Sequence, residues 1–363
     1  MITMEMYDLR SCTEEMLQTV CEELGLKRFR AAQLFQWVQQ KAVRSWDEIK
    51  NIGAKDLTLL SSRLSFYLPE LVKERRSIDG TRKYLFRLQD GEMIECVLMD
   101  YARELTRDRH TVCVSTQVGC AVGCAFCATG MEGFRRDLTI GEIVGQILDI
   151  THFIRQEDPD FQVTNVVFMG MGEPLLNYEQ VLSAIMLMNQ ERGLNIGMRR
   201  MTISTSGVVP RIIQLARDNP QVGLAISLHA SNDPARSRLV PMNRRYPLAQ
   251  LMEACKEYAK ITRRRITFEV ALTDDNANLG EAEALARLLK DQLGHVNLIP
   301  VNPVAGTGLK RPDLEKLKKF AHHLEVGGIS VSLREERGAD INAACGQLRR
   351  QWREGNHEPI DSI

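Results

Sequence analysis

Apolar residues recur with two different periods along the 363-residue chain, and the change of period predicts how the chain is divided. From residue 4 to about 65 the spacing is helical, as in LKRFRAAQLFQWVQQKAV. The stretch SWDEIKNI predicts a short capped helix, because Ser45 can cap its start and Glu48 follows three residues later. We therefore expect a helical accessory domain at 1–65.

A β-hairpin is predicted next. The run YLFRLQDGEMIECVLM indicates two strands joined at Asp90-Gly91, a pair of residues that favours a tight hairpin turn. We interpret 66–105 as a connector that carries this hairpin.

From about residue 111, short β-branched runs alternate with longer helical runs, which is typical of a parallel sheet with helical crossovers. The strands number slightly fewer than those of a complete barrel. We predict an α/β fold, a partial (β/α) TIM-like barrel over 106–350 followed by a polar tail at 351–363, with an open doubly wound sheet as the alternative. The predicted strands are 111–117, 163–170, 199–204, 222–228, 264–272, 295–301 and 328–334, and the helices between them include 139–154, 247–261 and 281–293.

The composition leaves the predicted fold unchanged and serves to exclude some classes of protein. Apolar residues make up 44% of the chain and charged residues 26%, as in ordinary globular enzymes. No apolar run has the length of a membrane span, and the start MITMEMYDLR lacks the basic and apolar stretches of a signal peptide. We expect a cytoplasmic protein with no membrane partner. The 47 basic and 47 acidic residues cancel, so RNA binding would depend on local patches.

Nine cysteines in a cytoplasmic chain point to metal binding or catalysis rather than to disulfides. Three of them, Cys120, Cys124 and Cys127, stand in GCAVGCAFCATG with the spacing C-x3-C-x2-C. Cysteine-only sites select zinc or iron–sulfur clusters. A 4Fe-4S cluster on three thiolates would leave one iron open to a substrate, whereas a zinc loop would need a distant Cys or His as its fourth ligand. We interpret four others as structural: Cys12, Cys21, Cys96 and Cys255.

Further polar and reactive residues follow the predicted strands, at the ends where a barrel builds its active site. Each is weak by itself, because a lone polar residue at a strand end is usually a cap or a satisfied core group. Their shared placement predicts one pocket. Cys113 lies inside the first strand, where a core role and a functional role both stay open. The residues at strand ends are Glu173 of GMGEP, Ser204, Ser227, His229, Asn302 and Cys345.

The cysteine spacing, with Phe126 directly before the last cysteine, resembles that of the radical S-adenosylmethionine (SAM) enzymes. The resemblance implies that the open iron binds SAM and that the cluster delivers one electron. SAM then splits into methionine and a 5′-deoxyadenosyl radical, while the protein orients the reactants and excludes water. In these enzymes the loop after the second strand holds the SAM amino group, which implies this role for Glu173.

Over nearly its whole length the chain is similar to the RlmN/Cfr family of radical SAM RNA methyltransferases, most of all to the RlmN branch. Similar segments include FRAAQLFQWVQQKAVRSWDEI, CVSTQVGCAVGCAFCATG, NVVFMGMGEPLLN, AISLHASNDPARSRLVPMN and RGADINAACGQL. The pair CVSTQVGC and AACGQL is specific, since ordinary radical SAM enzymes lack these two cysteines. Two loops near the expected RNA entrance depart from the family: VAGTGLKRP is shorter than usual, and LTDDNAN replaces the common LxGVND.

The resemblance implies a reaction that uses both additional cysteines. An adenine ring carbon is electrophilic, so polar methyl transfer from SAM fails there. One SAM instead methylates Cys345, and the radical from a second SAM takes a hydrogen from that methyl group. The carbon radical adds to adenine, Glu95 of MIECVLM accepts the ring proton, and Cys113 attacks the Cys345 sulfur to release the methylated RNA. A thiol reductant then resets the disulfide.

The same resemblance implies ligands and partners. Cys120, Cys124 and Cys127 would hold the 4Fe-4S cluster. Expected partners are 23S rRNA, with tRNA as a second RNA, an electron donor such as flavodoxin or ferredoxin, and a thiol reductant, and the protein is expected to be a monomer. The accessory domain is expected to bind RNA, and candidate phosphate contacts are Lys27-Arg28-Arg30, Arg199-Arg200 and Arg244-Arg245. The implied SAM contacts are Glu173, Pro174, Ser204, Ser227, Leu228, His229 and Asn302.

We predict a methyltransferase that acts on carbon 2 of an adenosine in 23S rRNA. The main alternative is a Cfr-type enzyme that methylates carbon 8 and confers resistance to ribosome-targeting antibiotics. A second alternative is a radical SAM enzyme with another substrate, which would need neither Cys113 nor Cys345. A third is a non-catalytic RNA-binding protein with a zinc-filled cysteine loop.

Overall fold

The computed structural model describes residues 6–101, 109–302, 307–335 and 337–348. The predicted polar tail at 351–363 lies outside the described residues, as does part of the loop VAGTGLKRP. In the described part of the chain, no helix is long and apolar enough to cross a membrane.

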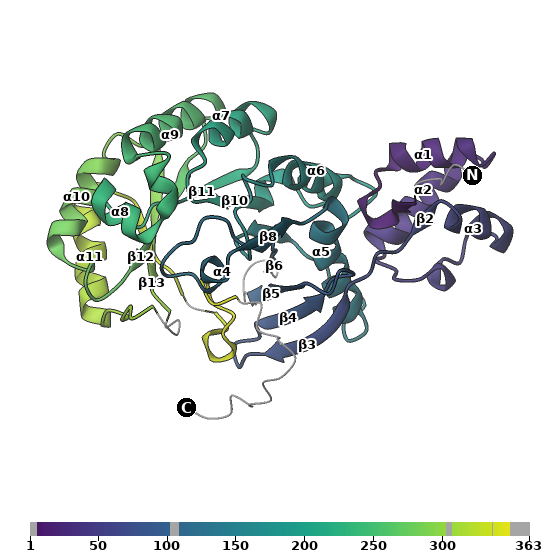
Figure 1. The fold of residues 1–363 in the computed structure, drawn as a ribbon, viewed down its shortest axis with the longest axis horizontal. Helices are drawn as coiled ribbons and strands as arrows, with labels where there is room; N and C mark the ends of the chain where they lie inside the picture. The colour runs from purple at the N-terminus through teal and green to yellow at the C-terminus, as the bar shows by residue number, and fades with distance from the viewer. Residues whose placement is uncertain (1–5, 102–108, 303–306, 336, 349–363) are drawn as a thin grey trace.

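The N-terminal part of the chain, purple in Figure 1, is helical and lies at one end of the molecule. The predicted capped helix is a short 3-10 turn at Trp46–Glu48, with the expected capping box between Ser45 and Glu48. The periodic run before it contains one α-helix that continues as a π-helical turn at Gln36–Gln40. The elements are β1 (Tyr7–Asp8), α1 (Glu14–Glu23), α2 (Phe29–Phe35), α3 (Ala54–Ser61) and β2 (Leu64–Ser65), and β1 pairs with β2 in parallel.

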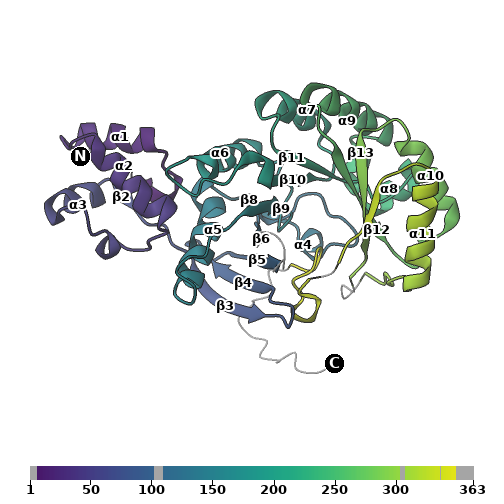
Figure 2. The ribbon, with the colours of Figure 1, turned by 180° about the vertical axis from the view of Figure 1, so that it is seen from behind.

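The rest of the chain is built around one 10-stranded sheet that curves into a partial barrel (Figures 1 and 2). From β6 to β14 its strands are parallel, and β5, β4 and β3 continue the sheet in antiparallel order. The order follows the chain without a reversal, which distinguishes it from a doubly wound sheet. The partial-barrel prediction is confirmed. In spatial order the strands are β14 (Val331–Leu333), β13 (Gly294–Pro300), β12 (Ile266–Leu272), β11 (Gly223–Ser227), β10 (Met201–Thr205), β9 (Asn165–Phe168), β6 (Arg109–Cys113), β5 (Met93–Tyr101), β4 (Arg82–Arg87) and β3 (Glu70–Arg76).

Helices cover the outer face of the curved sheet, as Figure 2 shows. Right-handed crossovers place successive helices on the same face, so the carboxyl ends of the parallel strands all meet at one edge. That edge is where the sequence predicts the pocket. The main helices are α5 (Ile140–Arg155), α6 (Tyr178–Asn189), α7 (Val209–Asp218), α9 (Leu248–Thr262), α10 (Leu279–Leu289) and α11 (Leu314–Val326), and shorter ones are α4 (Ala128–Met131) and α8 (Asp233–Leu239).

One strand of the sheet was not predicted. β3 has the sequence ELVKERR, in which charged residues outnumber apolar ones, so it lacks the alternation of apolar and polar residues that predicts a strand. It lies at the edge of the sheet, where one side faces solvent and charged side chains are tolerated. The predicted hairpin at Asp90-Gly91 is present between β4 and β5, and together with β3 it widens the barrel sheet.

A buried ion pair joins the N-terminal part to the barrel. Arg10 reaches Asp149 on α5 with 2.8 Å between Nη2 and Oδ2, and both side chains are almost fully buried. Nε of Arg44 lies 3.2 Å from the other oxygen of the same carboxylate. At Gly145 a Cβ would lie 2.7 Å from the Arg10 guanidinium, so the helix needs glycine where Arg10 crosses it.

Candidate active site

An antiparallel strand pair closes the base of the three-cysteine loop. β7 (Gln117–Gly119) pairs with β8 (Phe134–Asp137), and the Cys120 amide donates to the Gly133 carbonyl at 3.1 Å. Gly119 has a φ of +74°, and a Cβ there would lie 1.8 Å from that carbonyl oxygen. The position therefore requires glycine. The cysteine loop therefore begins and ends at adjacent points of the β7–β8 pair.

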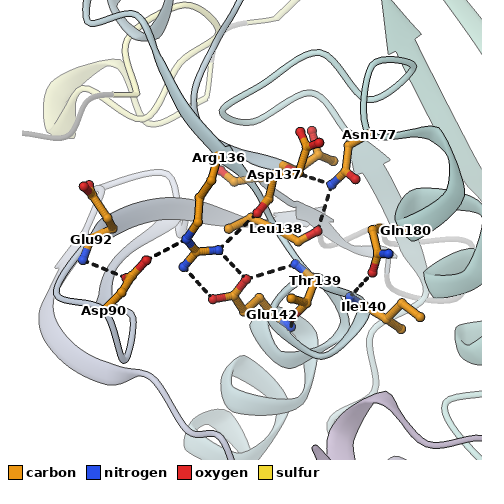
Figure 3. A network of polar contacts seen from close by, with 12 residues as sticks. Asp90, Glu92, Arg136, Asp137, Leu138, Thr139, Ile140, Glu142, Asn177 and Gln180 are labelled. Carbon is orange, nitrogen blue, oxygen red and sulfur yellow. Dashed lines mark hydrogen bonds and ion pairs between the residues drawn. The ribbon is translucent and has the colours of Figure 1, made fainter.

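Figure 3 shows the polar network that holds β8 in place. Arg136 donates to both carboxylate oxygens of Glu142 at 2.8 Å each, and its Nε donates to Asp90 at 2.6 Å. Glu142 also accepts from the Thr139 amide at 2.9 Å in the capping box that starts α5. Paired hydrogen bonds between arginine and carboxylate fix orientation as well as distance. The base of the cysteine loop is thereby tied to the β4–β5 turn and to α5.

The cysteine loop bounds a cavity at the carboxyl ends of the parallel strands, which we call the cluster cavity. Most of the residues that the sequence predicted for the site line this cavity. Pro174 and Leu228 do not line it, although both are buried. The predicted residues in its wall are Cys120, Cys124, Cys127, Glu173, Ser204, Ser227, His229, Asn302 and Cys345.

Glu173 is buried in the wall of the cluster cavity. One carboxylate oxygen accepts from the Ser206 amide at 2.7 Å, and the other accepts from the Leu175 amide at 3.1 Å. Burial raises the pKa of this carboxyl, while the hydrogen bonds oppose that change. A cationic group bound beside Glu173 would favour its ionised form, so the cavity is suited to an ammonium.

His229 is held in one neutral form. Its Nδ1 accepts from the Ala271 amide at 2.9 Å, which leaves the proton on Nε2 and makes Nε2–H the donor available to a ligand. Its ring packs edge-on against Phe126, with 4.6 Å between ring centroids. Burial lowers the pKa of His229 to about 3, and the Arg236 cation contributes. The imidazole is therefore uncharged at neutral pH.

This neutral histidine makes stability depend on pH in a defined direction. The pKa of His229 is about 3 in the folded protein and about 6.5 in an unfolded chain, so the unfolded state binds the proton first as the pH falls. The contribution of the neutral His229 to the free energy of unfolding is therefore complete above pH 6.5 and is lost as the pH falls toward 3. Between pH 7 and pH 5 we expect the wild type to lose about 2 kcal/mol more unfolding free energy than His229→Gln. Urea unfolding of both cluster-free proteins at the two pH values measures this difference, and equal losses would contradict a buried neutral histidine.

A second cavity adjoins the first, and we call it the thiol cavity because Cys113 and Cys345 both line it. Cys345 and Asn302 also line the cluster cavity, so Cys345 stands between the two spaces. All nine cysteines are free thiols in this structure. Burial raises the pKa of Cys113 to about 12. The two cysteines singled out by the sequence therefore share one cavity.

Gly338 and Gly346, which stand on either side of Cys345 in the sequence, predict a bent and exposed loop there. It is bent, with φ of +64° at Gly338 and +81° at Gly346. It is not exposed, because it packs against the cysteine loop: the Gly346 carbonyl accepts from the Ala128 amide at 2.8 Å. This contact leaves Cys345 half-buried between the two cavities.

Glu95, the predicted proton acceptor, does not line either cavity. It lies on β5 two residues before Val97, which does line the thiol cavity, so both side chains are on the same face of the strand. Its buried carboxylate is 2.9 Å from Nζ of Lys83. The same Nζ donates to the Asn342 carbonyl at 3.1 Å, which connects Glu95 to the loop of Cys345.

Two charged residues beside Cys345 were not predicted. Glu269 lines the cluster cavity, Arg334 lines the thiol cavity, and their nearest charged atoms are 3.8 Å apart. Burial raises the pKa of Cys345, and Arg334 opposes this because a cation favours the thiolate. A signal for Glu269 was available, since it is the one charged residue inside the apolar strand ITFEVAL.

Arg236 was also missed, although it lies within a segment quoted for the family. Its side chain is fully buried and donates to the carbonyls of Leu228 at 3.0 Å and Ser206 at 2.7 Å, and to Oδ1 of Asn243 at 2.9 Å. Burial lowers its pKa to about 10, so it stays cationic at neutral pH. Arg236 thus holds two strand-end segments together and places a positive charge toward Cys124.

The three thiols fit an iron–sulfur cluster. In the described part of the chain, no three His, Cys, Asp or Glu side chains are close enough to hold a single metal ion, whereas a cluster of several irons joins thiolates that lie further apart. Burial raises the pKa of Cys120 to about 12, so this cysteine becomes a thiolate only with a cation bound. The three thiols all face one cavity, and Arg236 offsets part of the negative charge.

Comparison with known proteins identifies the class. Residues 114–289 match the family model of the radical SAM superfamily, and residues 7–63 match that of the ribosomal RNA large subunit methyltransferase N-terminal domain. The fold is similar to the crystal structure of a radical SAM methyltransferase from Sphaerobacter thermophilus, with a TM-score of 0.90 and 46% identity over 95% of this chain and 99% of that one. The fold and the three-cysteine site define a radical SAM enzyme, which uses a 4Fe-4S cluster and SAM.

Relatives in sequence define the family. The chain is 64% identical to the probable dual-specificity RNA methyltransferase RlmN of Desulfitobacterium hafniense (strain Y51), over 97% of this chain and 98% of the relative. It is 50% identical to the protein of the same name from Heliobacterium modesticaldum, over 94% and 89% of the two chains. The chain belongs to the RlmN family of radical SAM RNA methyltransferases.

Proposed function

We propose that this enzyme methylates carbon 2 of an adenosine in 23S rRNA through a methyl group carried on Cys345, and that a tRNA adenosine is a second substrate. One observation carries the proposal: Cys345 lines the cavity of the cluster cysteines and also the cavity of Cys113. A sulfur in that position can receive a group on one side and deliver it on the other. The names of the relatives, which are called dual-specificity RNA methyltransferases, support two kinds of RNA substrate.

The residues of the cluster cavity divide into two sets. Cys120, Cys124 and Cys127 would hold the cluster. When bound, the cluster supplies one electron and SAM supplies both a methyl group and a hydrogen-abstracting radical. Glu173 would hold the SAM ammonium, and Ser204, Ser227, Asn302 and the Nε2–H of His229 would offer hydrogen bonds, with Pro174 and Leu228 supporting them from behind.

Cys345 acts as the methyl carrier because adenine carbon 2 has no lone pair with which to attack a sulfonium. The Cys345 sulfur has one, so it takes the methyl of a first SAM as a thioether and S-adenosylhomocysteine leaves. Arg334 favours the thiolate needed for this step. A second SAM is consumed when one hydrogen is removed from that thioether, which gives the carbon that joins the ring.

Cys113 and Glu95 complete the reaction. The ring adduct would lose one electron to the oxidised cluster and the proton of carbon 2 to Glu95, with Lys83 holding the carboxylate toward the Cys345 loop. Cys113 then forms a bond to the Cys345 sulfur as the bond from that sulfur to the product carbon breaks, and the released carbon gains the proton of the Cys113 thiol to complete the methyl group. Two electrons from a thiol reductant return the disulfide to thiols.

The proposal includes partners that the reaction requires. A low-potential one-electron donor such as flavodoxin or ferredoxin would reduce the cluster. The thiol reductant and both RNA substrates place the reaction in the cytoplasm. We propose that the enzyme works as a monomer, since a single copy of the chain forms the walls of both cavities.

The deciding experiment is anaerobic reconstitution with SAM, a reductant and a 23S rRNA fragment, followed by nucleoside mass spectrometry. We expect 2-methyladenosine, and the same product with tRNA. The Cys345→Ala protein should form none, while still cleaving SAM to 5′-deoxyadenosine. 8-Methyladenosine would assign the enzyme to the Cfr branch, and full methylation by Cys345→Ala would overturn the carrier role.

A further inference from the structure

The thiol cavity has an inner and an outer end. On β5, Val97 and Met99 are buried whereas Tyr101 is half-buried, so exposure increases along the strand. Across the strand pair, Cys113 lies opposite Val97 and Arg109 lies opposite Tyr101. Alternate residues of a strand share a face, so these side chains all lie on the face that lines the cavity. Cys113 marks the inner end of the cavity and Tyr101 marks the outer end, where Arg109 lies beside Tyr101.

Two guanidinium groups flank the Tyr101 ring at this outer end. The central guanidinium carbon of Arg109 lies 5.4 Å from the ring centroid, and that of Arg337 lies 4.7 Å from it. Arg337 comes from the segment that leads to Cys345, so the arrangement joins that segment to β5 and β6. We call Tyr101, Arg109 and Arg337 the Tyr101 platform.

Within the described residues, the hydrogen bonds of both platform arginines go to neutral oxygens and not to carboxylates. Nε of Arg109 donates to the Thr111 hydroxyl at 3.1 Å, and Nη1 of Arg337 donates to the Asp79 carbonyl at 3.2 Å. Both acceptors are neutral oxygens. Arg334 differs from these two arginines in having a carboxylate as its neighbour, since it lies in the cavity beside Glu269. Glu335 is the acidic residue among those that line the thiol cavity, and Arg337 of the platform lines the same cavity.

We propose that the Tyr101 platform binds the sugar–phosphate chain of the RNA next to the target adenosine and directs that base toward Cys345. The inference rests on the proposed function, since it takes RNA as the substrate. A guanidinium stacked on an aromatic ring keeps its N–H edge free for phosphate oxygens. Phosphate contacts of this kind set the register of a nucleic acid on its protein.

The spacing along β6 agrees with this role. Arg109 is four residues from Cys113, which corresponds to about 13 Å along a strand. A base that reaches the half-buried Cys345 sulfur must leave its stack, and its own phosphate then stays outside the cavity. The platform therefore lies where the backbone of the target nucleotide or its neighbour would pass.

The test separates methyl loading from RNA use. The holoenzymes Tyr101→Ala and Arg109→Gln are compared with Tyr101→Phe, which keeps the ring, and with Arg265→Gln, which removes an exposed charge at the opposite, amino-terminal edge of the barrel sheet. Methylation of Cys345 is measured first with SAM alone by peptide mass spectrometry. The KM and kcat for a 23S rRNA fragment, and the salt dependence of RNA binding, are measured next. Arg337 is left unchanged because it also holds the Asp79 carbonyl.

We expect all four variants to load the methyl group like the wild type. Arg109→Gln should raise KM for RNA roughly tenfold with little change in kcat, because a charge-assisted contact is lost. Its plot of log affinity against log salt should be shallower by about 1. Tyr101→Ala should raise KM as well, whereas Tyr101→Phe and Arg265→Gln should not.

The outcomes distinguish this inference from the function on which it rests. Failure of the wild type to methylate Cys345 or RNA would overturn the proposed function itself. Normal loading and normal RNA kinetics in Tyr101→Ala and Arg109→Gln would overturn the platform alone. Loss of loading in these two variants would also overturn it, because the residues would then be structural supports of the Cys345 segment.

Discussion

The Cys113→Ala enzyme is expected to remain covalently attached to RNA through Cys345. Cys113 and Cys345 line the same cavity, and both are free thiols. In the proposed reaction only an attack on the Cys345 sulfur breaks its bond to the product carbon, and alanine has no sulfur to make that attack. Methyl loading and radical addition precede this step and should proceed. Each enzyme molecule should therefore stop after one addition, with no measurable turnover.

Purification of Cys113→Ala from cells, followed by nuclease digestion and peptide mass spectrometry, detects the adduct as a nucleotide mass on the Cys345 peptide. Two variants serve as controls. The double variant Cys113→Ala, Cys345→Ala should carry no RNA, and Cys255→Ala, which removes a buried cysteine on α9, should turn over normally. A Cys113→Ala enzyme that is free of RNA and fully active would show that Cys113 does not resolve the adduct.

Asp149→Ala is expected to destabilise the protein by about 3–5 kcal/mol, which is a large part of the stability of a typical domain. Asp149 pairs with Arg10 at 2.8 Å, and both are almost fully excluded from water. The variant would leave the Arg10 guanidinium buried without its counter-charge, and it would also leave Arg44 without this partner. The loss arises from an unpaired buried cation more than from the removal of one favourable contact.

Urea unfolding measures this effect without the added salt that would screen the charges. Asp160→Ala removes an exposed carboxylate just beyond the end of α5, and it should change the unfolding free energy by less than about 0.5 kcal/mol. The double variant Arg10→Met, Asp149→Leu should recover part of the loss, since apolar replacements remove the unpaired charge. If Asp149→Ala loses no more than Asp160→Ala, the pair does not fasten the N-terminal part to the barrel.

Much of the barrel could be predicted because the sequence pattern of each strand is confined to adjacent residues. Every strand predicted between 111 and 334 is present, most of them shorter by one to three residues at an end. Buried parallel strands contain short runs of β-branched residues, and such a run can be recognised from the residues of the strand alone. β3 was missed for the opposite reason, since an edge strand rich in charge carries no such pattern.

The sequence by itself determined the fold class, the loop that would hold the cluster, and the two additional cysteines, because each of these is written in adjacent residues or in a specific motif. Only the tertiary structure decided that Cys345 stands between two cavities, that Glu95 is paired with Lys83 behind the cavity wall, and that Arg334 and Glu269 flank the Cys345 sulfur. Lys83 and Glu95 come from consecutive strands, β4 and β5, whereas the other contacts join residues far apart in the chain. Their meeting depends on strand register and on how the last loop folds back, and a one-residue shift of register would turn each side chain to the other face of its strand.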